Sequence, residues 1–253
     1  MTRGLIPALL FLIATLVGSV SPEAAAQQPA ESPSTTRSPL AVVVLDPAHG
    51  GADTGARGST GIVESEVTLS FARLIRVSLE AAGLRVILTR QSDQTVGSEE
   101  RSRTANAQRG AIFISVHVAS TGPEGTVRVY SSSEPAVSGD NFPRGASVSA
   151  AGLIRWDRAQ QSYLPTSRKL AALVQTQMAQ RFRGSPAIPP AAAVRQLQSV
   201  AAPAIAIEVS SVSLADRATL EKMGPALAEG VARAVAGFGP VFDQRAVAGR
   251  GER

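Results

Sequence analysis

The short apolar run LAVVVLD, at residues 40–46, constrains the fold more than any other feature of the chain. The run is continuous rather than alternating, which is typical of a strand buried on both faces, as in a parallel sheet. Comparable runs occur at RVILT (85–89), IFISVH (112–117) and AIAIEV (204–209), and residues 126–131 form a further strand candidate. Helical patterns separate most of these runs. The alternation predicts a single α/β domain with a mostly parallel twisted sheet flanked by helices.

The first helical pattern begins near Glu64 and ends before Gly83, which suits the residue after a helix. Its apolar residues recur at the helical spacing: Val67, Phe71, Leu74, Ile75 and Leu79. Further helices are expected over 99–109, 167–182 and 225–238. Ser213 with Asp216 forms a candidate capping box for another helix.

The expected domain spans residues 40–239, and the segments before and after it are expected to lie outside the folded domain. Residues 1–26 are expected to be a signal peptide, because a basic start and an apolar stretch precede a small-residue cleavage site, Ala-Ala-Ala. An uncleaved anchor is the alternative, although the apolar stretch is somewhat short of the roughly 20 residues that a span needs. We expect residues 27–39 to be a flexible linker, 132–164 a long surface excursion that could regulate the site, and 240–253 a frayed tail.

Composition restricts the chemistry. The chain has no cysteine and two histidines, so disulfides, thiol nucleophiles and cysteine-based zinc sites are excluded, and any metal must be held by histidine and carboxylate. Lys and Arg exceed Asp and Glu by 25 to 20. No dense basic run with interleaved aromatic residues is present, so we expect no nucleic acid partner; a mildly basic protein suits an anionic cell-wall polymer.

Four residues with metal-binding or acid–base chemistry are expected at one edge of the sheet. His49 follows the first strand, His117 ends the third, and Glu208 lies near the end of the last; functional groups gather beyond such strand ends. Glu64 opens the first helix, where Glu66 competes with it, and a structural helix-dipole role is the alternative for either. Two imidazoles and one carboxylate are the usual protein ligands of a hydrolytic zinc, and a further carboxylate can serve as general base.

Five segments, taken in order, resemble one family: LDPAHGGADTGARG, VESEVTL, LTRQSD, RSRTANAQRGAIFISVHVAS and APAIAIEVSSVS. They are similar to the zinc-dependent N-acetylmuramoyl-L-alanine amidases of the Amidase_3 type, which cleave bacterial peptidoglycan. The resemblance covers about residues 40–238. It implies one zinc ion held by His49, Glu64 and His117, with Glu64 selected over Glu66 by the residues that follow it. It also implies that Glu208 is the catalytic glutamate.

The resemblance further implies hydrolysis of the amide bond between N-acetylmuramic acid and the L-alanine of the stem peptide. The expected partners are peptidoglycan and an activating protein of the envelope, with the enzyme a monomer in the periplasm, the extracellular space or the cell wall. Substrate-binding residues are not identified. Several residues match framework positions or a W-x-x-A-Q stretch found in part of the family: Arg90, Arg101, Asn106, Trp156, Ala159, Gln160 and Ser167.

Three departures from the family pattern lie beside the expected site. Ala48 replaces a glycine, Val118-Ala119 replace Ala-Asn, and residues 210–214 (SSVSL) replace Gly-Phe-Leu-Ser-Asn. We expect these changes to alter the walls of the cleft. Two alternatives therefore stand beside the amidase: a catalytically weak peptidoglycan-binding protein, and a zinc hydrolase of another cell-wall amide. A serine hydrolase is not favoured, because the chain has no G-x-S-x-G motif.

Overall fold

A computed structural model describes residues 40–133, 156–190, 192, 194–213 and 216–248. The expected signal peptide at 1–26 and linker at 27–39 lie outside this range, as do residues 134–155 of the expected excursion. The last part of that excursion, Trp156–Tyr163, is a 3₁₀ helix, η1. Within the described part of the chain, every helix is too short or too polar to cross a bilayer.

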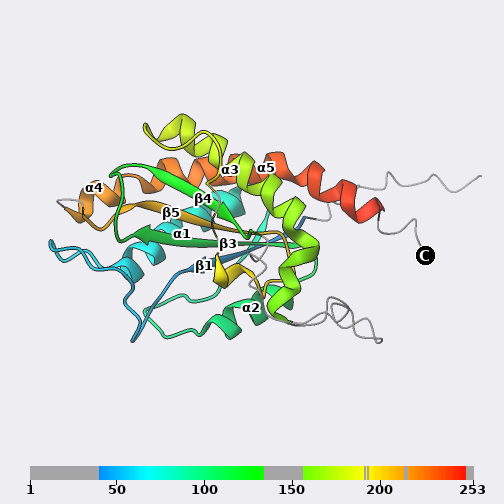
Figure 1. Ribbon diagram of the computed structural model, residues 1–253, viewed down its shortest axis with the longest axis horizontal. Coiled ribbons are helices and arrows are strands. Elements are labelled where there is room, and N and C mark those ends of the chain that lie inside the picture. Colours follow the sequence, from blue (N-terminus) through cyan, green and yellow to red (C-terminus); the bar gives the residue numbers. More distant parts are fainter. Residues whose placement is uncertain (1–39, 134–155, 191, 193, 214–215, 249–253) are drawn as a thin grey trace, which may run out of the picture. The chain divides into compact units, whose positions relative to one another are not determined.

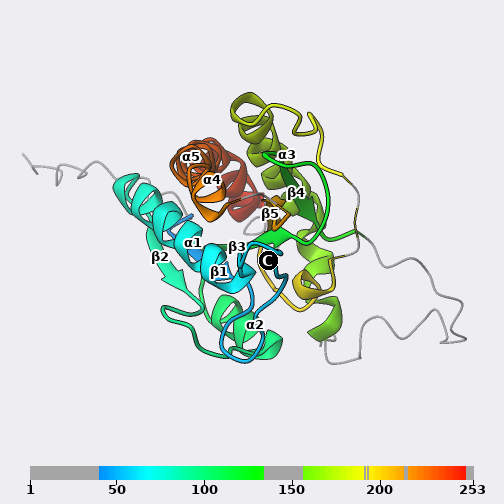
Figure 2. The same cartoon turned by 90° about the vertical axis from the view of Figure 1, so that its left-hand side faces the viewer.

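Five strands form one sheet in the order β2-β1-β3-β5-β4 (Figure 1, and Figure 2, where all five are labelled). Strands β1 (Val42–Pro47), β2 (Arg85–Leu88), β3 (Ala111–Ala119) and β5 (Ala204–Ser211) run parallel to their neighbours, and β4 (Val127–Ser131) is antiparallel to β5. Residues 120–126 between β3 and β4 are too few for a crossover, which takes a dozen or more residues, so β4 runs back. The α/β fold with a mostly parallel sheet is confirmed.

One face of the sheet is covered by three long helices: α1 (Glu64–Ala81), α3 (Leu164–Arg181) and α5 (Gly224–Ala248) (Figure 2). Side chains alternate along a strand, so every second residue of each strand faces these helices. The larger core therefore includes Val43 and Leu45 of β1 packed with Phe71 and Ile75 of α1. These apolar side chains are fully buried, which makes this face the main source of hydrophobic stabilisation.

The opposite face has a smaller apolar core and carries the polar residues of interest. Val42 and Val44 of β1 pack there with Ala105 of α2 (Ser98–Asn106) and Leu197 of the 3₁₀ helix η2 (Arg195–Leu197). Further along the strands, the same alternation places Asp46, Ser115, His117, Glu208 and Arg128 on this face.

The last helix extends beyond its expected end. The pattern predicted an end at residue 238 and a frayed tail from 240, because Pro240 has no N–H to continue the hydrogen-bond ladder. α5 instead continues through Pro240 to Ala248. Beyond the proline, Val241 and Phe242 pack against the larger core, and the rings of Phe238 and Phe242 lie 6.0 Å apart. These contacts offset the lost hydrogen bond.

The short helix α4 (Arg217–Glu221) begins three residues later than a cap at Ser213 would place it. Its N-cap is Asp216, whose carboxylate accepts a hydrogen bond from the Thr219 amide at 2.6 Å. The capping box predicted from Ser213 and Asp216 is therefore wrong in its register. Ser213 instead donates its amide to the hydroxyl of Ser211 at 3.1 Å.

Candidate metal centre

The first element of the site is the tight loop after β1, which carries His49. His49, Gly50 and Gly51 have φ values of 62°, 123° and 61°, so the chain reverses immediately after the strand. Gly55, later in the same loop, passes directly over the site. A Cβ on Gly55 would lie 2.6 Å from Oε2 of Glu64, so only glycine fits there.

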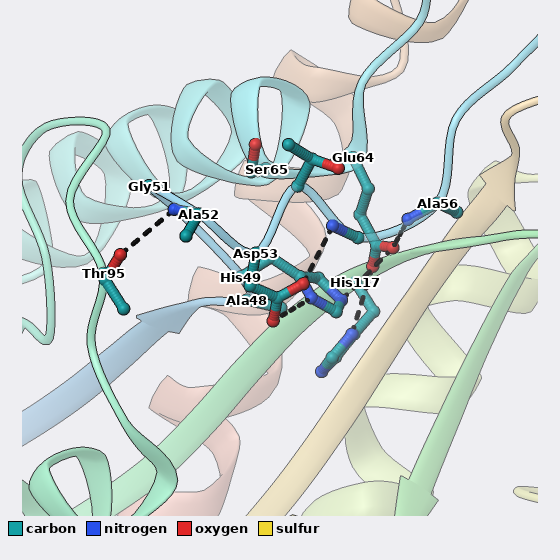
Figure 3. A network of polar contacts seen from close by, with 12 residues as sticks. Ala48, His49, Gly51, Ala52, Asp53, Ala56, Glu64, Ser65, Thr95 and His117 are labelled. Atoms are coloured by element: carbon teal, nitrogen blue, oxygen red, sulfur yellow. Dashed lines mark hydrogen bonds and ion pairs between the residues drawn. The ribbon is translucent and has the colours of Figure 1, made fainter.

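Glu64, the first residue of α1, stands between the two histidines (Figure 3). Its Oε2 lies 3.2 Å from Nε2 of His49, and its Oε1 lies 3.1 Å from Nδ1 of His117. One potential ligand atom from each of the three side chains lies within 4.8 Å of the other two. The structure thus brings together the three residues that the sequence predicted as metal ligands.

The charge of Glu64 is held in place by backbone donors as well as by the histidines. The Ala56 amide donates to Oε2 at 2.8 Å and the Val118 amide to Oε1 at 3.0 Å. Burial alone would raise the pKa of Glu64, but hydrogen bonds from His117, His49 and Ala56 outweigh burial and hold it well below its usual range. The site therefore contains a carboxylate ready to bind a cation.

The pKa of His49 is shifted in the opposite direction to that of Glu64. Its hydrogen bond to Glu64 raises the pKa of the imidazole; burial opposes that shift, and Asp53 adds to it. Nδ1 of His49 lies 2.8 Å from Oδ2 of Asp53, and the imidazole lowers the pKa of that aspartate.

The donor set fits zinc. Two imidazole nitrogens and one carboxylate oxygen face a common point, which are the protein ligands of a catalytic zinc site with one position open to water. The other ring nitrogen of each histidine has a polar partner, Asp53 for His49 and Gln196 for His117. Such outer partners orient the imidazoles of metal centres.

Glu208 lies beside this group rather than in it. It is paired in register with His117 of β3 and with Arg128 of β4, so the three side chains share one face of the sheet. Oε1 of Glu208 lies 3.0 Å from Nη2 of Arg128. This is an ion pair without hydrogen-bond alignment, because Nε and Nη2 of Arg128 are buried and lack a hydrogen-bond partner among the described residues.

Two buried arginines fasten the loops that carry the site. Arg90 is 1% exposed and donates to the carbonyls of Pro47, Ala48 and Ser65 at 2.6–2.9 Å, which ties the end of β1 to the start of α1. Arg101 pairs with Asp46 and donates to the carbonyl of His49 at 2.7 Å. Asn106 bonds the backbone of Ser199 and Ala201. All three belong to the scaffold of the site.

Gln160, from the stretch similar to W-x-x-A-Q, also has scaffold contacts. Its side-chain amide donates to the carbonyls of Val200 and Ala202 at 2.7 and 2.8 Å, and its oxygen accepts from Ser167 at 2.5 Å. These bonds fasten the segment that leads from η2 into β5.

The departures from the family pattern lie at the ends of β1, β3 and β5, and residue 214 lies outside the described residues. Ala48, Val118 and Ala119 are buried, as are Ser210 and Ser211. The pairing of β3 with β5 shifts register after Val118, and Ser210 has a φ of 47° with its hydroxyl accepting from the Gly125 amide at 2.8 Å. The expected effect of the replacements on the cleft stays a prediction.

Fold and site together define a class: an α/β protein with a two-histidine, one-glutamate centre at the carboxyl edge of its sheet. The model of one family, Amidase_3, described as N-acetylmuramoyl-L-alanine amidase, matches residues 43–236. The chain belongs to this family.

Curated relatives match over shorter segments. The N-acetylmuramoyl-L-alanine amidase AmiC of Neisseria meningitidis serogroup B is 41% identical over 76 residues, which are 30% of this chain and 18% of that protein. The sporulation-specific N-acetylmuramoyl-L-alanine amidase of Bacillus subtilis is 40% identical over 85 residues, 33% of either chain. The match therefore spans a third or less of each of these relatives.

Solved structures match the fold over most of the chain. An N-acetylmuramoyl-L-alanine amidase from Clostridium difficile 630 aligns with a TM-score of 0.58 and 20% identity over 79% of this chain and 96% of that one. An N-acetylmuramyl-L-alanine amidase from Mycobacterium smegmatis aligns with a TM-score of 0.57 and 20% identity over 79% and 97%. At this identity the likeness establishes the shared fold.

Proposed function

We propose that this chain is a zinc-dependent peptidoglycan amidase that hydrolyses the amide bond between N-acetylmuramic acid and the L-alanine of the stem peptide. The observation that carries the proposal is the convergence of His49, Glu64 and His117 on one point, in a chain that belongs to the amidase family. The same three residues would hold one zinc ion.

When bound, zinc acts as a Lewis acid that polarises the scissile carbonyl and acidifies water. Glu208 would act as the general base, taking a proton from the attacking water and giving it to the alanine nitrogen as the amide breaks. Its register position next to His117 supports this role, because the carboxylate then lies on the same face of the sheet as the ligands. Arg128, at 3.0 Å, would fix where that carboxylate points.

The surroundings of the enzyme are part of the proposal. The relatives named above are amidases by name, and one solved neighbour with 18% identity is a CwlD amidase in complex with the GerS lipoprotein. We further infer an enzyme that acts on peptidoglycan, with an envelope protein as a candidate activator, and keep from the sequence the expectation of an exported monomer in the periplasm, the extracellular space or the cell wall.

The central test replaces the proposed base. Glu208→Gln should keep zinc binding and lose about 10²–10⁴-fold in turnover, which is the usual contribution of a positioned general base. Glu124→Gln, which removes an exposed carboxylate from the loop between β3 and β4, is the matched control and should keep full activity. Muropeptide release that continued undiminished in Glu208→Gln would refute the assignment of the base.

Mass analysis of the products distinguishes the amidase from its alternatives. The proposed reaction releases intact stem peptides and leaves unsubstituted glycan. Cleavage within the stem peptide, or release of acetate, would instead identify a zinc hydrolase of another cell-wall amide. Retention of peptidoglycan without any product, in protein saturated with zinc, would identify a binding protein.

A further inference from the structure

Gln196 of η2 links His117 to a buried carboxylate beneath the site. Its Oε1 lies 3.1 Å from Nε2 of His117, and its Nε2 lies 2.7 Å from Oδ2 of Asp46. Asp46 is fully buried and also receives hydrogen bonds from Ser115 at 2.8 Å and Thr89 at 2.6 Å, together with the guanidinium of Arg101. The side chain of Gln196 therefore connects the buried, multiply hydrogen-bonded Asp46 to His117, one of the proposed metal ligands.

The orientation of the Gln196 amide follows from its partners. A carboxylate paired with an arginine only accepts hydrogen bonds, so Asp46 must face the NH₂ end of the amide. The oxygen end then faces His117, and an oxygen there accepts only from a protonated Nε2. A singly protonated His117 consequently carries its lone pair on Nδ1, the nitrogen that faces Glu64 at 3.1 Å.

His49 has the opposite arrangement. Its Nδ1 faces the carboxylate of Asp53 at 2.8 Å and its Nε2 faces Glu64 at 3.2 Å. Asp53 thus favours the proton on Nδ1 and leaves Nε2 free for a cation. Each histidine has one nitrogen directed at the centre and the other engaged by an acceptor, but the two rings use different nitrogens.

We propose that Gln196 is a positioning residue that, through Asp46, fixes His117 with Nδ1 as its metal-binding atom. The inference rests on the proposed zinc function and adds to it a residue outside the three-ligand set. Among the described residues, the side-chain hydrogen bonds of Gln196 go to His117 and Asp46, so its effect on the centre passes through the ring of His117.

The test uses zinc-loaded full-length protein and two matched substitutions. Gln196→Met keeps the length of the side chain and removes both hydrogen bonds; Gln198→Met makes the same change two residues later, at a half-buried side chain outside the group formed by His117, Gln196 and Asp46. Chelator competition should show zinc binding about 10–100-fold weaker in Gln196→Met, the usual cost of losing an outer partner of a metal ligand. Gln198→Met should match the wild type.

Nitrogen NMR provides a readout that does not depend on activity. The chain has two histidines, so long-range ¹H–¹⁵N spectra of the zinc-loaded protein contain two ring systems. The wild type should show zinc on Nδ1 of one ring and on Nε2 of the other. The Nε2 proton of His117 should exchange slowly with water, and Gln196→Met should make that exchange faster.

Three results would distinguish a failure of the role proposed for Gln196 from a failure of the proposed zinc function. Zinc binding by the wild type with an unchanged dissociation constant and unchanged proton exchange in Gln196→Met would overturn the role of Gln196 alone. Zinc on Nε2 of His117 in the wild type would overturn it even if the variant failed to fold. A wild type that binds no zinc would contradict the proposed function, and this inference with it.

Discussion

Glu64 and Glu66 are two residues apart in the first turn of α1, yet their environments differ completely. Glu64 is 4% exposed and contacts both histidines, whereas Glu66 is exposed and pairs with Arg217. A helix turns by 100° per residue, so positions two apart point to different sides. This geometry supports Glu64 rather than Glu66 as the metal ligand, as the family resemblance implies.

Removing either of these two carboxylates tests the proposed ligand set. Glu64→Gln should weaken zinc binding by more than about 100-fold, because losing a ligand costs more than losing an outer partner. Glu66→Gln removes a carboxylate from the same turn and should leave zinc binding unchanged. Isothermal titration with zinc measures both, and equal affinities for the two variants would contradict the ligand set.

The pKa shifts of Glu64 and His49 predict how the stability of the protein depends on pH when a chelator is present. The pKa of Glu64 lies below its ordinary value of 4.5, so its stabilising effect is present above pH 4.5 and is lost as the pH falls. The pKa of His49 lies above its ordinary value of 6.5, so its effect is present below pH 6.5 and is lost as the pH rises through the folded-state pKa. The two ranges overlap from pH 4.5 to 6.5.

Denaturant unfolding in the presence of a chelator checks this expectation. The difference in unfolding free energy between wild type and Glu64→Gln should be greatest within the overlap and smaller on either side. The Glu66→Gln variant should show no such maximum. A difference that rose steadily with pH would mean that the imidazole of His49 does not take part.

Sequence could predict the residues of the site that carry the chemistry, but not their partners. His117 and Glu208 stand out because they lie toward the ends of apolar runs, and His49 because it follows one closely. Arg128, Gln196 and Asp53 carry no comparable local signal. Arg128 meets Glu208 only because β4 pairs with β5, and Gln196 meets His117 only after η2 packs under the sheet.

At the scale of elements, the contact between the end of β1 and the start of α1 holds the site together. Arg90 is central to this contact, since its guanidinium donates to carbonyls of both segments, and the Thr68 hydroxyl of α1 adds a hydrogen bond to the Ala48 carbonyl at 3.0 Å. Apolar runs and helical periodicity predicted both elements, because each depends on residues near in sequence. They did not predict the continuation of α5, which depends on packing of Val241 and Phe242 against the distant core.

Replacing Arg90 should therefore weaken the scaffold. Arg90→Met leaves several buried carbonyls short of a donor and should lower the free energy of unfolding by about 3 kcal/mol, since each such group costs about 1–3 kcal/mol. Arg73→Met is the control: Arg73 is exposed and donates to one carbonyl, that of Gln91. Urea denaturation of the two variants should separate them clearly, and similar losses would contradict the role of Arg90.

For the whole molecule, zinc binding and folding should be linked. The three proposed ligands come from the loop after β1, from α1 and from β3, so the site exists only when these segments have folded together. Free zinc at about 100 times its dissociation constant should raise the free energy of unfolding by about 2.7 kcal/mol. Thermal unfolding with zinc and with chelator measures the effect, and Glu64→Gln should show less than about 0.4 kcal/mol of it at the same zinc concentration.

The two faces of the sheet carry residues with different roles. Residues that face α1, α3 and α5 form the larger apolar core, whereas alternate residues of the same strands carry the polar site. A substitution at Arg128 consequently leaves Val127 and Val129 in place, whereas Tyr130 packs against the smaller core. Residues of the polar face can therefore be substituted without repacking the larger core, which makes this scaffold evolvable: variants at Arg128 should remain folded even where activity is lost.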